Sequence, residues 1–531
     1  MSPTLLSLND LPPELFPIIA SHLPLYATPS TLLSLALANR HISTMALPIL
    51  FSHLIIKNEK HSLRMINRLL DEPGLGLGVR ELHIMSELSD GIRLLPQQHS
   101  PNESFDMITG LKKVIRRSLL PNIHTLGIYL TSGWDPMEYS DLQLSNGLGE
   151  LLSDFWADLK YKCPRMKNLI LDNVGDTKRR RWLEDCGLYD FQDLSMLIHW
   201  QPLYSGGLEN HNNLITNLTV LSSSLHTLSL SQFISSSELY VSPLFTLDFP
   251  HLKSLHLYYY AVEDSSAVMA FWRRHPMIER LELAYEADTL VKSYFTDDLD
   301  SYFFPNLRYL KADYTDVRIL APVLHRLITL EISASINSQI PYLLRSVIPE
   351  GLPSLKGLSI SDIVSSDARG NKPPEGSLWY ETEDGEFREN IQGDKQAIIH
   401  TWRKYFLPSI ARGAPNVIEF SIDGSLNKPG QFMDMSSQFE AFFHLERLYV
   451  SFLSYNSRKR YESTERPWFS HKARLLASAC RSLKSVTDIS TVDLPYLSAT
   501  FRRDKGGDVE EVILRKGCGM QVGREHLAFL T

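Results

Sequence analysis

The sequence predicts an α/β fold, in which a small N-terminal helical module precedes a long solenoid of short strand–helix repeats. A spacing of apolar residues, apolar-x-x-apolar-x-apolar, recurs along most of the chain, and proline often stands two residues before it. The first fifty-odd residues instead space their leucines as helices do. A single compact core stops growing at roughly 250–300 residues, so a chain of 531 residues indicates repeats or several domains.

The N-terminal segment predicts three helices. In the first, Leu15, Ile18, Ile19 and Leu23 fall on one face, after two prolines that a first helical turn tolerates. Thr28 followed by proline predicts the start of the second helix, and a third is expected over residues 39–54, bent at its proline. A domain this small cannot bury all of its leucine side chains by itself, so a partner or a neighbouring domain is expected to cover the rest. The residues leave two interpretations open: the module docks onto a partner, or it caps the solenoid.

The same segment resembles an F-box of the form common among fungal proteins. The resemblance lies in Leu11-Pro12-Pro13-Glu14-Leu15, in Leu32–Ala38 with Asn39-Arg40, and in Ala46–Leu54, within about residues 8–55. Many F-boxes carry a tryptophan shortly after the basic residue that matches Arg40, where this chain has His41-Ile42. The F-box of that family docks onto the Skp adaptor of SCF-type ubiquitin ligases. The resemblance implies adaptor contacts at Leu11, Pro12, Leu15, Ile18, Ile19, Leu32 and Leu35.

The apolar spacing marks about a dozen repeats at central steps of roughly twenty to thirty residues. Proline after a helix stops the helix, and the residue before it favours extended backbone, so each repeat is expected to be helix, proline stop and short strand. These units resemble irregular leucine-rich repeats without the conserved asparagine of the regular family. The copies are at Val79–Ile84, Ile123–Ile128, Met166–Leu171, Leu225–Leu230, Leu252–Leu257, Ile278–Leu283, Leu307–Ala312, Leu327–Ile332, Leu355–Ile360, Val417–Ile422, Leu445–Val450 and Val509–Leu514, with a degraded one near Leu483–Val486.

These patterns give expected domain boundaries. Residues 1–56 form the F-box-like module, 57–78 a helical joint and 79–531 the solenoid. The period is interrupted by insertions near 172–224, which contains the basic run 178–181, and near 361–415, whose first half is expected to be an acidic loop. A helix is expected from about residue 396 to 411.

Residues between the pattern leucines point to the opposite side of each strand, the concave side of such repeats, which binds proteins. Arg280 is expected to stand beside Tyr309, and Glu282 beside Lys311, with all four exposed. Any one of these residues is more often a solvated strand residue than a contact, but together they are the predicted partner site. Acidic and tyrosine-rich loops near residues 259–300 favour a basic partner segment. The predicted site is His256, Tyr258, Arg280, Glu282, Tyr309, Lys311 and Asp313, with His83, Tyr129, Glu331, Glu419, Asp423, Arg447 and Tyr449 further along the face.

Other functions find little support in the sequence. The net charge of −8 gives no footprint for nucleic acid, and neither a secretory signal nor a membrane span is expected. The four cysteines lie far apart, which indicates reduced thiols and a cytoplasmic or nuclear protein. No phosphate loop, nucleophile elbow or metalloprotease motif occurs, so we expect no catalysis, no cofactor and no metal.

The expected function is therefore substrate recognition in an SCF-type ubiquitin ligase. The resemblance implies a Skp-type adaptor as one partner and, through it, a cullin, while the repeats hold an unknown substrate protein. Two alternatives remain. The repeats can serve as a protein-binding scaffold without a ligase, or an unrecognised hydrolase site can lie in the insertions.

Overall fold

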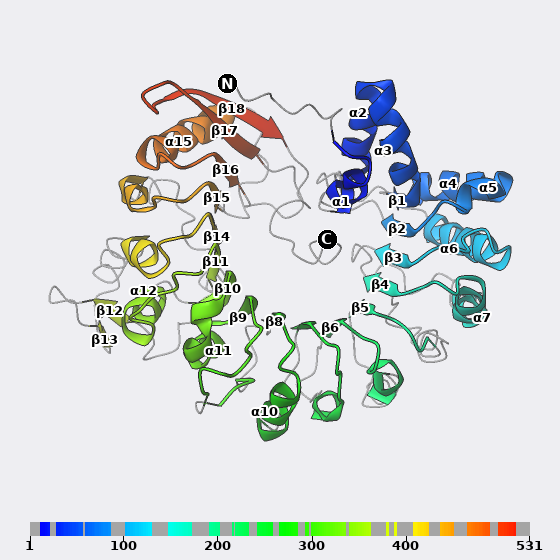
Figure 1. Cartoon of the computed structure of the whole chain (residues 1–531), viewed down its shortest axis with the longest axis horizontal. Coiled ribbons are helices and arrows are strands. Elements are labelled where there is room, and N and C mark those ends of the chain that lie inside the picture. Colours follow the sequence, from blue (N-terminus) through cyan, green and yellow to red (C-terminus); the bar gives the residue numbers. More distant parts are fainter. Residues whose placement is uncertain are drawn as a thin grey trace. The chain divides into compact units, whose positions relative to one another are not determined.

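The computed structural model describes residues 11–21, 28–56, 59–85, 101–129, 147–172, 191–201, 215–216, 218–232, 242–258, 265–284, 293–296, 299–335, 339–362, 379–381, 387–389, 407–423, 436–450, 465–488 and 497–516. The chain forms two compact units, Met1–Leu239 with the last residues, and Tyr240–Gly517. We call these unit 1 and unit 2. In each unit, short parallel strands stack along the repeats while helices lie on the other side of the strand layer (Figure 1). The fold is thus a mixed α/β, leucine-rich-repeat-like solenoid.

Unit 1 begins with three helices and continues as a parallel sheet. Its described elements are α1 (Leu15–Ser21), α2 (Thr28–Ala38), α3 (Arg40–Ser52), β1 (His53–Ile56), α4 (Glu59–Asp71), α5 (Pro73–Gly76), β2 (Glu81–Met85), α6 (Pro101–Arg116), β3 (Thr125–Tyr129), α7 (Gly147–Lys162), β4 (Asn168–Asp172), β5 (Met196–Gln201) and β6 (Thr227–Gln232). Each strand from β1 to β6 pairs in parallel with the next.

The three predicted helices form, with one correction at the end of the third. Helix α2 begins at Thr28, and Asn39 caps α3 by accepting the Ile42 backbone N–H at 2.8 Å. Helix α3 contains Pro48 but ends at Ser52. The next four residues are strand β1, which pairs with β2, so the helices lead directly into the first strand of the repeats.

The predicted insertion at 172–224 contains a further strand. Strand β5 pairs in parallel with β4 and β6, and the positions of its pattern are Leu194, Leu197 and His199. His199 occupies the place of a pattern leucine and is buried, and burial lowers its pKa to about 4. Because histidine is polar, the apolar spacing of the other repeats is incomplete in β5, and the sequence did not predict this strand. The basic run 178–181 lies outside the described residues.

Unit 2 continues the same architecture. Its described elements are η4 (Ser242–Thr246), β7 (Ser254–Tyr258), α10 (Ser265–Arg274), β8 (Arg280–Ala284), β9 (Tyr309–Asp313), α11 (Tyr314–Ile319), η5 (Ala321–Arg326), β10 (Thr329–Ser335), α12 (Gln339–Tyr342), the π-helix η6 (Leu343–Val347), β11 (Gly357–Asp362), β12 (Trp379–Glu381), β13 (Phe387–Glu389), β14 (Glu419–Asp423), η8 (Ser436–Ala441), β15 (Arg447–Val450), α15 (Glu465–Ala479), β16 (Ser485–Asp488), β17 (Leu497–Arg503) and β18 (Val509–Lys516).

Two predictions for unit 2 were wrong in detail. The insertion at 361–415 contains a short antiparallel hairpin, β12–β13, where a loop was expected. The last predicted repeat, Val509–Leu514, is strand β18, which runs antiparallel to β17, and its pattern residues Val509, Val512 and Leu514 are only half-buried. Of the helix expected at 396–411, the part within the described residues runs from 407 to 413.

The pattern residues form the core of both units, as predicted. Leu255, Leu257, Leu281 and Leu283 are fully buried, and their equivalents in the other parallel strands are also buried. Between repeats, the backbone forms a ladder at the turn that enters each strand. The Lys253 carbonyl, for example, accepts the N–H groups of Glu279 and Arg280 at 2.8 and 3.0 Å, and the same double contact recurs along both units. This ladder provides hydrogen-bond partners for the backbone N–H groups of each turn, without the asparagine of regular leucine-rich repeats.

The solenoid ends in an antiparallel cap. Strands β16, β17 and β18 are adjacent, and the Arg503 guanidinium of β17 donates to the carbonyls of Ala477, Cys480 and Leu483 at 2.9, 3.2 and 3.1 Å. These carbonyls end α15 and the turn after it, where cations are favourable. The cap thereby provides hydrogen-bond donors for the carbonyl groups at the C-terminal end of α15.

Candidate functional site

The face of unit 2 opposite its helices carries a network of polar side chains on four adjacent strands. Parallel pairing places Arg280 beside Tyr309 and Glu282 beside Lys311, as predicted from the repeat register. Strand β7 adds His256 next to Glu282, and β10 adds Glu331 next to Lys311. We call the following eight residues the polar network: Ser254, His256, Tyr258, Arg280, Glu282, Tyr309, Lys311 and Glu331.

The expectation that Arg280, Glu282, Tyr309 and Lys311 are all exposed was wrong, because Glu282 is buried and the other three are half-buried. Glu282 and His256 have no exposed surface. They occupy the middle row of the face, where Arg280 and Tyr258 contact Glu282 and Ser254 contacts His256. Arg280 and Lys311 retain 22% and 26% of their side-chain surface. The predicted contact site therefore has two layers, in which the buried carboxylate of Glu282 lies beneath the partly exposed side chains of Arg280 and Lys311.

Glu282 is the centre of the network. Its Oε1 accepts hydrogen bonds from Arg280 Nε and Nη2 at 3.0 and 2.8 Å, and its Oε2 accepts one from the Tyr258 hydroxyl. His256 Nδ1 lies 3.3 Å from the same Oε2, while Nε2 contacts the Ser254 hydroxyl at 2.7 Å. Burial alone would raise the pKa of Glu282, but the interactions with His256, Lys311 and Arg280 outweigh it and leave that pKa below its usual range. Glu282 is thus a buried carboxylate held by its neighbours.

The outer part of the network stacks cations on tyrosine rings. The Arg280 guanidinium lies 3.7 Å above the centre of the Tyr309 ring, and the Lys311 ammonium 6.0 Å from that of Tyr258. The Tyr309 hydroxyl donates to Glu331 Oε1 at 2.8 Å, and Lys311 Nζ lies 3.7 Å from the other oxygen of Glu331. Each cation therefore lies beside a carboxylate and a tyrosine ring, and Lys311 lies beside two carboxylates.

Two carboxyl groups of this face have a raised pKa. Burial raises the pKa of Glu331 to about 7, against the opposing effect of Lys311. Burial likewise raises the pKa of Asp313 to about 7, although Asp313 accepts a hydrogen bond from Ser333 at 2.7 Å. Both groups therefore change charge near neutral pH.

Glu331 gives a test of this electrostatic arrangement. Its pKa is higher in the folded than in the unfolded chain, so the folded state binds more protons between about pH 4.5 and 7, and stability falls as pH rises through that range. We expect Glu331→Gln to remove this contribution and keep an acceptor for Tyr309. From about pH 5 to about pH 8, the variant's free energy of unfolding should rise relative to that of the wild type by up to about 3 kcal/mol. Urea unfolding at both pH values measures this, and an unchanged difference would contradict the buried position of Glu331.

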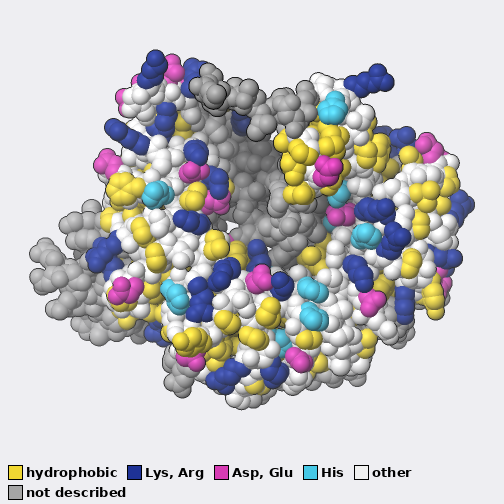
Figure 2. All heavy atoms as spheres, viewed as in Figure 1, with side chains coloured by type: hydrophobic (Ala, Val, Ile, Leu, Met, Phe, Trp, Pro, Cys, Tyr) yellow, Lys and Arg dark blue, Asp and Glu magenta, His cyan; other side chains and the backbone are white. Residues whose placement is uncertain are grey.

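The N-terminal helices carry the other predicted site, and its three residues on α1 all lie on the exposed side of that helix. Phe16 and Ala20 belong to a buried cluster shared with α2 and α3, whereas Leu15, Ile18 and Ile19 are 38%, 53% and 38% exposed. Figure 2 shows hydrophobic side chains gathered over these helices. The exposed large apolar residues of the helices, which we call the apolar patch, are Leu15, Ile18, Ile19, Leu33, Leu37 and Phe51.

The remaining predicted adaptor residues differ in exposure. Leu32 is a core residue with almost no exposed surface, so its assignment as a contact is corrected. Leu35 and Leu11 are half-buried against the cluster, and Pro12 is exposed. Leu33 and Leu37 are also exposed, although the F-box resemblance did not assign them to the adaptor, and their spacing of four places them on one side of α2.

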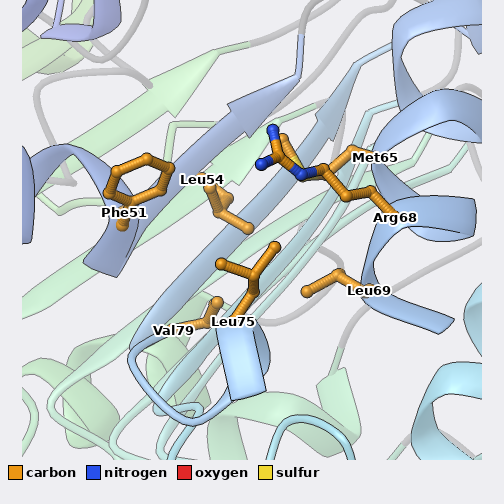
Figure 3. Close-up of a pocket in the computed structure, with 7 residues that line it drawn as sticks. All are labelled: Phe51, Leu54, Met65, Arg68, Leu69, Leu75 and Val79. Carbon is orange, nitrogen blue, oxygen red and sulfur yellow. The ribbon is translucent and has the colours of Figure 1, made fainter. Parts of the chain in front are cut away.

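A cleft lined by Phe51, Leu54, Met65, Arg68, Leu69, Leu75 and Val79 lies between the end of α3 and helix α4 (Figure 3). Its volume is about 20 Å³, which is room for about one water molecule. The cleft is therefore too small to hold a substrate.

Chemistry-bearing side chains are otherwise dispersed in the described ranges. No group of three or more histidine, cysteine, aspartate or glutamate residues there could hold a metal ion. Cys163 and Cys480 are buried, and burial raises the pKa of both thiols. In the same part of the chain, no helix combines the length and hydropathy of a membrane-spanning segment.

Comparison with known proteins gives little beyond the geometry. No protein-family model matches the chain, and no curated protein matches it. Among solved structures, the chain is similar to the leucine-rich repeat-containing protein LegL7 from Legionella pneumophila, with 13% sequence identity and a TM-score of 0.31. The similarity covers 68% of this chain and 89% of that one. So low a TM-score does not establish a shared fold, and the assignment rests on the parallel strands and buried repeat positions.

Proposed function

We propose that the chain is a non-catalytic adaptor with two binding surfaces, acting as the substrate-recognition subunit of an SCF-type ubiquitin ligase. In this proposal the apolar patch of α1–α3 docks onto a Skp-type adaptor and, through it, a cullin. The strand face of unit 2 holds a substrate protein. The carrying observation is that Leu15, Ile18 and Ile19, which the F-box resemblance assigns to the adaptor, lie on the solvent side of α1.

The packing of α1 supports this assignment. An amphipathic helix normally turns its apolar face to the core. Helix α1 buries Phe16 and Ala20 but leaves the three aliphatic side chains of the docking assignment exposed. Although α3 leads directly into the first strand of unit 1, Leu15, Ile18 and Ile19 stay 38%, 53% and 38% exposed. Contiguous exposed apolar surface on a folded domain is typical of a protein–protein interaction site.

The strand face supports the second half of the proposal. Tyrosine and arginine are enriched among residues that dominate binding energy, and here their side chains are held by hydrogen bonds and ring stacking before a partner arrives. Side chains already ordered in the free protein lose less conformational entropy on binding. The adaptor would act by holding a substrate near enzymes of other subunits, which raises its effective concentration there.

We expect the double substitution Leu15→Asp with Ile18→Asp to abolish recovery of a Skp adaptor and a cullin from native lysate. Each substitution places a carboxylate in an apolar interface, which costs several kcal/mol when the charge has no partner. Affinity purification of the tagged full chain, followed by mass spectrometry, measures the recovery.

Val220→Asp is the matched control, because Val220 is a similarly exposed aliphatic residue of unit 1 outside α1–α3. The control should recover the adaptor at the wild-type level. Retention of the adaptor by the double variant would show that α1 is not the docking surface. Absence of both proteins from the wild-type purification would favour a scaffold without a ligase role.

A further inference from the structure

The accessible charges of the polar network are positive, while its acidic groups lie underneath. Arg280 and Lys311 keep about a quarter of their side-chain surface, whereas Glu282 has none and Glu331 keeps 11%. The two cations belong to adjacent strands and to neighbouring rows of the face. A partner that approaches this face therefore meets two cations and two tyrosine rings first.

The carboxylates fix the positions of these cations. Glu282 orients Arg280 with two hydrogen bonds, and Tyr309 supports the guanidinium from the other side at 3.7 Å. Lys311 is placed between Glu331 at 3.7 Å and the Tyr258 ring. Cations that are held in place in this way lose little side-chain entropy when they bind an anion.

We propose that the Arg280–Lys311 pair is where the strand face of unit 2 binds an acidic peptide segment, with both cations receiving its carboxylates. This inference rests on the partner-binding half of the proposed function and is independent of the docking of α1–α3. The tyrosine rings supply apolar contact beside the charges, as aromatic residues do at interface centres.

The charge of the whole chain makes the local arrangement informative. A chain with net charge −8 repels acidic peptides in general, so their capture requires a local cationic site. The acidic loops from which the sequence favoured a basic partner lie almost entirely outside the described residues. Within the described face, Glu282 is enclosed by its own neighbours and presents no surface to a basic group.

The same geometry makes binding depend on pH. The titratable groups next to the pair are His256 and Tyr258 from β7, Glu282 from β8, Tyr309 from β9 and Glu331 from β10. Asp313 lies two residues after Lys311 on the same side of β9, and Asp316 contributes to its raised pKa. Burial lowers the pKa of His256, against the opposing effect of Glu282. Glu331 and Asp313 gain their charge as pH rises through about 7, and a charged Glu331 competes with the peptide for Lys311. Binding should therefore weaken with rising pH.

The test uses the full chain and two fluorescent peptides of equal length, oligo-glutamate and oligo-lysine, with binding followed by fluorescence anisotropy. We expect oligo-glutamate to bind and Lys311→Met to weaken it about tenfold, the scale of one lost charge-assisted contact. Lys356→Met is the matched control, because Lys356 is an exposed lysine of the same unit outside the strand face, and it should leave binding unchanged. Glu331→Gln should bind oligo-glutamate more tightly than the wild type does at about pH 8, and the two should differ less at about pH 6.

Arg280 requires a paired substitution, because its loss alone leaves Glu282 buried without its main cation. Arg280→Met with Glu282→Gln removes both charges and should also weaken oligo-glutamate binding. Equal effects of Lys311→Met and Lys356→Met would overturn the proposal. So would tighter binding of oligo-lysine, or no binding of either peptide. An oligo-phosphoserine peptide that binds while oligo-glutamate does not would also overturn it, since the anion would then be a phosphate.

Discussion

Replacing Arg280 by alanine is expected to lower the free energy of unfolding by about 3 kcal/mol, the scale for a buried ion pair that loses one partner. Arg280 donates two hydrogen bonds to Glu282, whose carboxylate has no exposed surface. Without the guanidinium, the carboxylate stays buried beside His256, Tyr258 and Lys311 and loses two charge-assisted hydrogen bonds. Urea unfolding followed by circular dichroism measures the loss.

The strand register alone suggests a much smaller effect, about 0.5 kcal/mol, as for a surface residue. The two expectations differ because Glu282 is buried, which register does not reveal. The double variant Arg280→Met with Glu282→Gln should recover part of the loss, because no charge is then left unpaired. A loss below about 0.5 kcal/mol for Arg280→Ala would mean that Glu282 is solvated.

The second large effect concerns the repeat leucines. Leu255→Ala and Leu281→Ala should each lower the free energy of unfolding by about 2–5 kcal/mol, because each removes a fully buried side chain from a packed core. The two residues face each other across β7 and β8, so their effects should not add independently. The same urea measurement on single and double variants tests both statements.

Ile328→Ala serves as the control for the leucines. Ile328 is 47% exposed and lies just outside β10, so its truncation should change stability by no more than about 0.5 kcal/mol. A similar loss in Ile328→Ala and Leu281→Ala would contradict the repeat register.

Much of the fold could be predicted from the sequence because a leucine-rich repeat is local. Most of the parallel strands are marked by three apolar residues at fixed spacing, as in Leu252, Leu255 and Leu257, and a proline often stands two residues before them. Strand β5 escaped because His199 replaces an apolar residue. Strand β18 was assigned wrongly because an antiparallel terminal strand can match the same spacing.

The candidate sites could be located but not described in depth. The sequence placed Arg280 beside Tyr309 because side chains alternate between the two faces of a strand with a period of two residues. This alternation fixes the register of neighbouring strands. It could not show that Glu282 and His256 are covered, because cover depends on side-chain conformations in neighbouring repeats. In α1, helical spacing grouped Leu15, Ile18 and Ile19 correctly, but packing with α2 and α3 decided that Phe16 faces the core.

The central claim is that the exposed face of α1 docks onto a Skp-type adaptor. Titration of the purified chain with a purified Skp adaptor in a calorimeter tests it directly, without other proteins of a lysate. A one-to-one complex with a negative heat-capacity change, as apolar burial produces, is the predicted result, and Leu15→Asp with Ile18→Asp should abolish it. No binding by the folded wild-type chain, or equal binding by the double variant, would contradict the claim.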